Sequence, residues 1–141
     1  MDTKALAKAK PLLVYYFVDP VSDPMDVNYK FSRKFELGVL QEEIVELINK
    51  NFVAKKVALP ADGDMKKVEN QARIEIWSPT KKMVGRITLE NDGLLNKGAF
   101  IGFVKARQAK SEKLVKDEIA RLEKMRKDAE AKKSPETASK D

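Results

Sequence analysis

The chain has 141 residues and a net charge of +6, and 35% of its residues are charged, against roughly 25% in an average globular protein. This length suits one domain with an appendage. Because the chain contains no cysteine and no histidine, disulfides, thiolate metal sites, thiol nucleophiles and histidine bases are excluded. No other residues mark a catalytic centre or a site for a metal or cofactor, so we expect a protein that is not an enzyme.

The N-terminal residues do not have the pattern of a targeting segment. Residues 1–10 alternate lysine with alanine and leucine and lack the apolar run of a signal peptide. They predict a short helix that Pro11 ends, because its ring removes a backbone donor. The longest apolar run, residues 12–18, is far shorter than the roughly 20 residues of a membrane-spanning helix. We expect a soluble, cytoplasmic protein with no membrane span, unless a leader peptide has been removed.

Residues 12–18, LLVYYFV, are apolar throughout and rich in β-branched and aromatic side chains. Such a run predicts a strand that is buried on both faces, in the centre of a sheet covered by helices. Residues 19–26 follow with prolines and aspartates that cannot continue a central strand. They predict a loop at the carboxyl end of the strand, where open α/β sheets often bind ligands, although we favour a plain connection.

Residues 36–49 predict a helix, because their apolar residues recur along one side. We expect Leu40, Ile44 and Leu47 to be buried. Residues 27–35 are ambiguous, and we expect an irregular lead-in that packs on the sheet. The predicted apolar stripe comprises Leu37, Leu40, Ile44, Leu47 and Ile48.

The next part of the chain predicts three strands. Residues 52–59 form one strand, which Pro60 ends, and residues 74–77 and 83–89 form an antiparallel hairpin. The connecting segments are a loop at residues 61–64, one or two helical turns at residues 65–70, and a turn at residues 78–82.

The remaining chain is helical in composition from residue 94 to about residue 133. Residues 94–104 carry enough apolar side chains to cover the sheet as a final helix. Apolar residues then become scarce, until a narrow stripe resumes with the spacing of a coiled-coil seam. This stripe, which we call the C-terminal seam, consists of Val115, Ile119, Leu122 and Met125. Pairs of acidic and basic residues at i, i+4 support a solvated helix here: Glu112 with Lys116, Asp117 with Arg121, and Glu123 with Lys127.

We therefore predict that residues 109–133 form a charged helical extension. Its C-terminal seam is expected to dock a protein partner or a second copy of the chain. The alternative is a solvated extension with a few incidental apolar residues. Residues 134–141 predict a disordered tail.

The order of these elements resembles that of the thioredoxin fold, in which a βαβ unit is followed by a ββα unit in one sheet. Residues 5–17 resemble the family's lead-in helix and buried first strand, residues 51–57 the strand after its first long helix, and residues 74–86 its closing hairpin. The resemblance covers about residues 4–108. It implies a thioredoxin-like, three-layer α/β sandwich with a central mixed sheet of about four strands, in a domain of residues 1–108.

The chain departs from thioredoxins at their functional residues. Thioredoxins carry a C-x-x-C motif after the first strand, where this chain has PVSDP at residues 20–24. They also place a cis-proline before the hairpin, where this chain has NQAR at residues 70–73. No functional residue of the family is carried over, so the resemblance implies no thiol–disulfide exchange.

Three functions follow from this sequence. The one we favour is a non-catalytic thioredoxin-like protein-interaction module, a subunit or accessory factor of a larger assembly. The second is a basic nucleic-acid-binding protein, although the basic residues are not interleaved with aromatic ones as a stacking platform requires. The third is an enzyme that uses Asp19, Asp23 and Asp26 with a divalent metal. Their spacing lacks the alternating ligands and the central glycine of a calcium loop.

Overall fold

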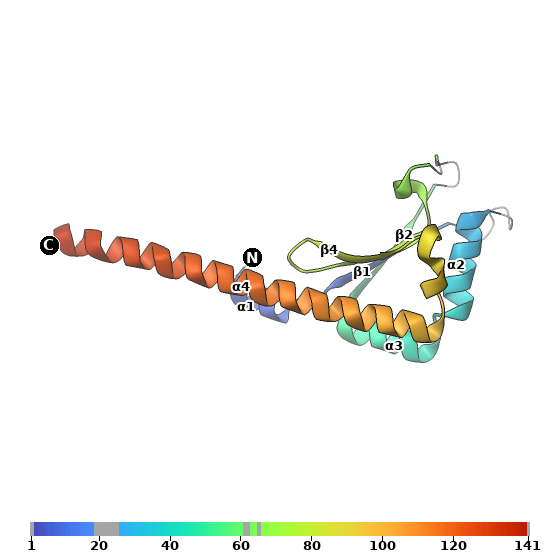
Figure 1. Cartoon of the computed structure of the whole chain (residues 1–141), viewed down its shortest axis with the longest axis horizontal. Coiled ribbons are helices and arrows are strands. Elements are labelled where there is room, and N and C mark those ends of the chain that lie inside the picture. The colour runs from blue at the N-terminus through green and yellow to red at the C-terminus, as the bar shows by residue number, and fades with distance from the viewer. Residues whose placement is uncertain (1, 19–25, 61–62, 65, 141) are drawn as a thin grey trace.

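A computed structural model describes residues 2–18, 26–60, 63–64 and 66–140. Figure 1 shows a twisted sheet with α1, α3 and α4 below it, and α4 runs far beyond the sheet. The predicted α/β fold, with a mixed sheet of four strands and a long C-terminal helix, is confirmed. The elements in chain order are α1 (Thr3–Lys8), β1 (Leu12–Phe17), α2 (Val27–Gly38), α3 (Glu42–Asn51), β2 (Val53–Ala58), the 3₁₀ helix η1 (Val68–Asn70), β3 (Arg73–Trp77), β4 (Met83–Ile87), the 3₁₀ helix η2 (Leu89–Leu94) and α4 (Lys97–Lys140).

The sheet has the strand order β2-β1-β3-β4, so the apolar strand β1 is in the interior as predicted. β1 runs parallel to β2 and antiparallel to β3, and β3 and β4 form the predicted antiparallel hairpin. This order and these directions are compatible with a thioredoxin-like α/β fold.

The hydrophobic core lies on one face of this sheet. Leu13 and Tyr15 of β1 point to it, and the ring of Tyr15 lies 4.7 Å from that of Phe35 in α2. Phe35 in turn lies 5.4 Å from Phe100 of α4, measured between ring centroids. Buried residues of α3, such as Ile44, join the same cluster. One cluster therefore holds α2, α3 and α4 against the same side of the sheet.

The opposite face carries no helix within the described part of the chain. Leu12, Val14 and Tyr16 point to it, because successive side chains of a strand alternate between the two faces. The thioredoxin resemblance implied a third layer, but no described helix forms one. The physical reason is the connection from β2 to β3, whose only described helical element is the three-residue η1.

The helix predicted for residues 36–49 is wrong in its bounds, because the chain forms the two helices α2 and α3 there. The backbone N–H groups of Val39 and Leu40 both donate to the carbonyl of Phe35, which closes the end of α2. Gly38 is the last residue of α2. A glycine at the end of a helical pattern is a stop signal that the prediction missed.

This break changes which residues are buried. Ile44 is fully buried as predicted, whereas Leu40 and Leu47 are only partly buried. Leu37, which the predicted stripe placed in the core, is 70% exposed. Val39, which lay outside the stripe, is completely buried. The periodicity fails here because the helix ends between these two positions.

The expected irregular lead-in, residues 27–35, lies within α2. The side chain of Asp26 begins this helix by accepting the N–H of Asn28 at 2.7 Å. The amide oxygen of Asn28 accepts a backbone N–H just before β3, which ties the helix to the sheet. Phe31 and Phe35 are four residues apart and both enter the core, which is the helical spacing.

α4 continues without a break across the domain boundary expected at residue 108. α1 packs against it, Ser111 is buried, and Leu114 packs against the hydrophobic cluster. Independent folding of residues 1–108 stays a prediction. The helix bounds reach Lys140, and the disorder expected for residues 134–141 in solution also stays a prediction.

The buried phenol of Tyr15 generates a prediction for alkaline pH. Its hydroxyl donates to Oε2 of Glu36 at 3.0 Å, and burial raises the pKa of Tyr15, with the charge of Glu36 adding to the rise. The unfolded chain ionises its tyrosines near pH 10. The stabilisation from the neutral phenol is therefore complete below about pH 10 and is lost as the pH rises above it.

We expect the free energy of unfolding, measured by urea denaturation over a pH series, to fall above about pH 10. Tyr15→Phe should make this fall shallower, because the variant has no phenol to ionise. The same pH dependence in both proteins would contradict the prediction.

Candidate functional site

The uncovered side of the sheet is the candidate site, and we call it the open face. Four of its residues, Val53, Leu12, Trp77 and Met83, occupy paired positions on successive strands, so they form an apolar row across the whole sheet. Val53 is 55% exposed and Met83 40% exposed, while Leu12 and Trp77 are half-buried. The strand register places these residues on the open face: Leu12, Val14, Tyr16, Val53, Lys55, Val57, Arg73, Glu75, Trp77, Met83 and Arg86.

A hollow of about 430 Å³ lies on this face. Its lining comes from β1, β2, β3 and the hairpin turn, with no contribution from a described helix. Leu12, Val14 and Trp77 supply apolar surface, and Lys55 and Lys81 lie at its border. The hollow is therefore a depression in the sheet surface itself, open to a molecule that approaches from the side away from the helices.

A buried polar network organises one end of the open face. Nε of Arg73 donates to Oε2 of Glu75 at 2.9 Å, and the side chains of this ion pair are 9% and 8% exposed. Nε1 of Trp77 donates to Oε1 of the same carboxylate at 3.2 Å. The guanidinium of Arg73 stacks 3.7 Å above the ring centroid of Tyr16. Both oxygens of Glu75 thus accept hydrogen bonds, which suits a structural role better than proton transfer.

Tyr16 shares this environment. Burial raises the pKa of Tyr16, and the negative charge of Glu75 raises it further, whereas Arg73 acts in the opposite direction. The phenol is therefore neutral under physiological conditions. The network holds one charged pair and two aromatic rings in fixed positions on the sheet.

The solvated charges around the open face are basic. Lys55 lies on β2, Arg86 on β4 opposite Glu75, and Lys81 in the hairpin turn. Lys81 has a φ of 67°, in the left-handed region that side chains rarely adopt. The hairpin turn thus holds a cation beside the apolar row.

The predicted C-terminal seam lies at the junction of α4 with α1 and the hairpin. Val115 and Ile119 line a hollow of about 250 Å³ together with Ala7, Ala9 and Pro11. Leu122 lines another hollow with Leu6 and the hairpin turn. These three seam residues are half-buried, whereas Met125 is 55% exposed. The N-terminal helix of the same chain therefore covers part of the seam, and its role in binding stays a prediction.

The ion pairs on this stretch of α4 differ in part from the expected set. Arg121 was expected to pair with Asp117 but binds Glu118 instead, at i, i+3. Its hydrogen bond lowers the pKa of Glu118. Nη1 of Arg121 also lies 3.1 Å from the sulfur of Met125. Arg121 thus lies beside the exposed end of the seam.

The aspartates considered for metal chemistry are not a site in the described structure. Asp19 and Asp23 lie outside the described residues, and Asp26 caps α2. The described residues contain no group of three or more acidic side chains that could hold a metal ion. No helix in this part of the chain is long and apolar enough to cross a lipid bilayer.

Comparison with known proteins gives no match. No protein-family model matches the chain, and no curated protein or solved structure is significantly similar to it. The function is therefore inferred from the geometry of the open face and of α4.

Sequence reasoning missed the open face. Two features of the sequence indicated it. Apolar and polar residues alternate around Trp77, and the segment between Pro60 and β3 has too few apolar residues for a helix that covers a sheet. Four strands with helical segments for only one face imply an uncovered second face. Lys55 and Trp77 are distant in sequence, and they line the same hollow because β2 and β3 lie on either side of β1 in the sheet.

Removal of the central carboxylate tests the buried network. We expect Glu75→Ala to lower the free energy of unfolding by about 3–5 kcal/mol, because it leaves the Arg73 cation buried without its partner. The exposed control Glu123→Ala should change it by less than about 0.5 kcal/mol. Chemical denaturation measures both, and equal stabilities of the two variants would refute the structural role of the network.

Proposed function

We propose that this chain is a non-catalytic, thioredoxin-like protein-interaction module, a subunit or accessory factor of a larger assembly. The open face is the observation that carries the proposal. A strand that is apolar at every position is typical of burial on both faces, and β1 is such a strand, yet no described helix covers the side of β1 that carries Leu12 and Tyr16. A protein partner that packs on the open face would supply the missing layer.

The composition of the open face fits a protein partner. Its centre is apolar, with Leu12 and Trp77, and its rim carries Lys55, Lys81 and Arg86. Apolar centres with polar rims are typical of protein interfaces, and tryptophan is among the residues that contribute most to binding energy. Trp77 is also the single tryptophan of the chain, so its fluorescence reports on this surface.

α4 is the second element of the proposal. The C-terminal seam ends at Met125, which is exposed, and the helix continues to Lys140. A partner or a second copy of the chain that packs along this end would bury Met125. In this proposal Val115, Ile119 and Leu122 belong to the same interface as Met125 and form the part of it that lies next to α1.

Substitutions on the exposed ends of the apolar row test the open face. We expect Val53→Glu and Met83→Glu each to reduce capture of a partner from the native organism by at least about tenfold, because a carboxylate must then be desolvated in the interface. Leu37→Glu is the matched control, since Leu37 is an exposed leucine of α2, and it should capture normally. Unchanged melting temperatures would show that all three variants fold.

Partners that bind wild type and both open-face variants equally would refute the role of the open face. Nucleic-acid binding is the other candidate function. It is favoured by the exposed sheet surface, on which Trp77 lies with Lys55 on one side and Arg86 on the other. The same wild-type protein can be used to test it. Against it, Arg73 already stacks on Tyr16, so Trp77 is left as the one unstacked aromatic ring among the open-face residues. Single-stranded RNA that quenches Trp77 fluorescence, with an affinity that falls steeply with salt, would establish that candidate instead.

The end of α4 is tested separately by Met125→Glu. We expect this variant to lose any self-association or partner binding that depends on the C-terminal seam, because the charge falls on an apolar contact. Ala131→Glu is the control, since nine residues along the helix from Leu122 place it on the opposite side. Sedimentation velocity of wild type and variants measures the association, and equal behaviour of both variants would refute the role of the seam.

A further inference from the structure

The outer edge of β2 presents unpaired backbone groups. β2 is the end strand of the sheet. The N–H of Val53 donates to Pro11 at 2.9 Å, and that of Leu59 donates to Phe17 at 2.7 Å, both on the β1 side. Because backbone direction alternates along a strand, every second N–H between them also faces β1. The N–H groups that face outward, without a partner in the described structure, belong to Ala54, Lys56 and Ala58.

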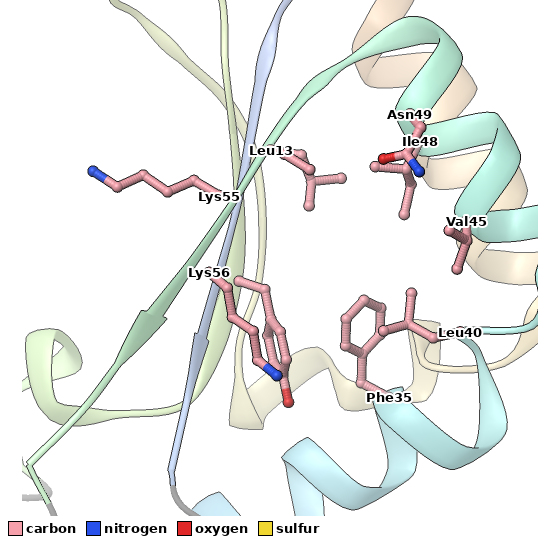
Figure 2. A pocket seen from close by; sticks show the side chains of 10 residues that line it. Leu13, Phe35, Leu40, Val45, Ile48, Asn49, Lys55 and Lys56 are labelled. Carbon is pink, nitrogen blue, oxygen red and sulfur yellow. The ribbon is translucent and has the colours of Figure 1, made fainter.

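An apolar cavity opens directly beside this edge, between β2 and α3. Figure 2 shows the side chains of Leu40, Val45 and Ile48 pointing into it from the helical side, and Lys55 pointing away from it. Its volume is about 220 Å³, below the roughly 300 Å³ at which pockets for drug-sized molecules begin. The cavity therefore has room for a single large side chain rather than for a cofactor.

The small side chain of Ala54 connects the edge to the cavity. Ala54 pairs with Leu13 and therefore faces the helical side of the sheet. A residue opposite Ala54 on an added strand would face the same side. We propose that the outer edge of β2 binds an extended, acidic segment of a partner protein, which adds a strand to the sheet and inserts an apolar side chain into this cavity.

The charged residues at the edge of β2 favour an acidic segment as the ligand. Lys56 lies 3.4 Å from Glu36 and is already paired, whereas Lys55 has no acidic partner in the described structure. An added strand that alternates apolar and acidic residues would present its apolar side chains to the cavity and its carboxylates to Lys55. A second copy is a poor occupant, because antiparallel pairing of two β2 edges sets lysine against lysine.

The probe for this site is a phage-displayed library of random peptides, selected on the full-length chain, followed by synthesis of the enriched peptides. We expect alternating apolar and acidic residues in these peptides. Lys56→Pro should weaken their binding by at least about tenfold, because it removes an outward N–H and leaves the hydrogen bonds to β1 intact. Ala54→Phe should weaken binding similarly by filling the cavity.

Met83→Glu is the control, because Met83 lies on the far edge of the sheet, and it should bind the peptides normally. Hydrogen exchange adds an independent measurement: the amides of Ala54, Lys56 and Ala58 should become protected when a peptide binds. The inference is overturned if no peptide is enriched, if both edge variants bind as wild type does, or if these amides exchange unchanged. Peptides whose binding is weakened by Met83→Glu alone would also overturn the inference, and would instead support binding at the open face.

Discussion

The contact between Tyr15 and Phe35 determines how this molecule is layered. The two rings join the central strand β1 to α2, and Phe35 extends the contact to Phe100 of α4. Aromatic side chains bury large areas and dominate core energetics. Because α2, α3 and α4 all gather on this cluster, the core is complete on one side of the sheet. On the other side of β1, Val14 is buried by its neighbours, whereas Leu12 and Tyr16 stay half-buried and no described helix covers them.

The open face is stable without a partner because its polar groups satisfy one another. Glu75 accepts hydrogen bonds from both Arg73 and Trp77, so each of the two buried charges described on that face has a partner. A buried charge without a partner would lower the free energy of unfolding by several kcal/mol. Because the charges here are paired, the chain can leave Leu12 and Trp77 partly exposed without that loss. The hydrogen bond from Trp77 to Glu75 fixes the indole in the free chain, so binding of the partner that we propose would cost less conformational entropy there.

The sequence predicted the parts of the fold that depend on local pattern. The run from Leu12 to Val18 is apolar at every position, so its place inside the sheet followed directly. The hairpin followed from alternation on both sides of a proline-containing turn. The break after Gly38 was missed because Leu37 and Leu40 continue the helical spacing across it. The structure was needed to show that Val39 points into the core and Leu37 into solvent.

The candidate surfaces were less predictable, because each combines residues from distant segments. The C-terminal seam was visible as a periodic stripe, but its partial cover by α1 depends on packing between the two ends of the chain. The cavity beside β2 exists because Ala54 is small where a larger residue would fill the space between strand and helix. The pattern within a single segment cannot predict how Ala54 of β2 packs relative to α3.

The length of α4 has a mechanical consequence. Its 44 residues, at a rise of about 1.5 Å each, give a rod of about 66 Å. Phe100 and Val104 anchor the first turns in the core, so the direction of the rod is fixed by the sheet rather than by a hinge. A body bound to the sheet and another bound along α4 before the tail that we predict to be disordered would be held at a set distance and a set rotation about the helix axis. In an assembly of the kind we propose, α4 would thereby set the spacing between its partners.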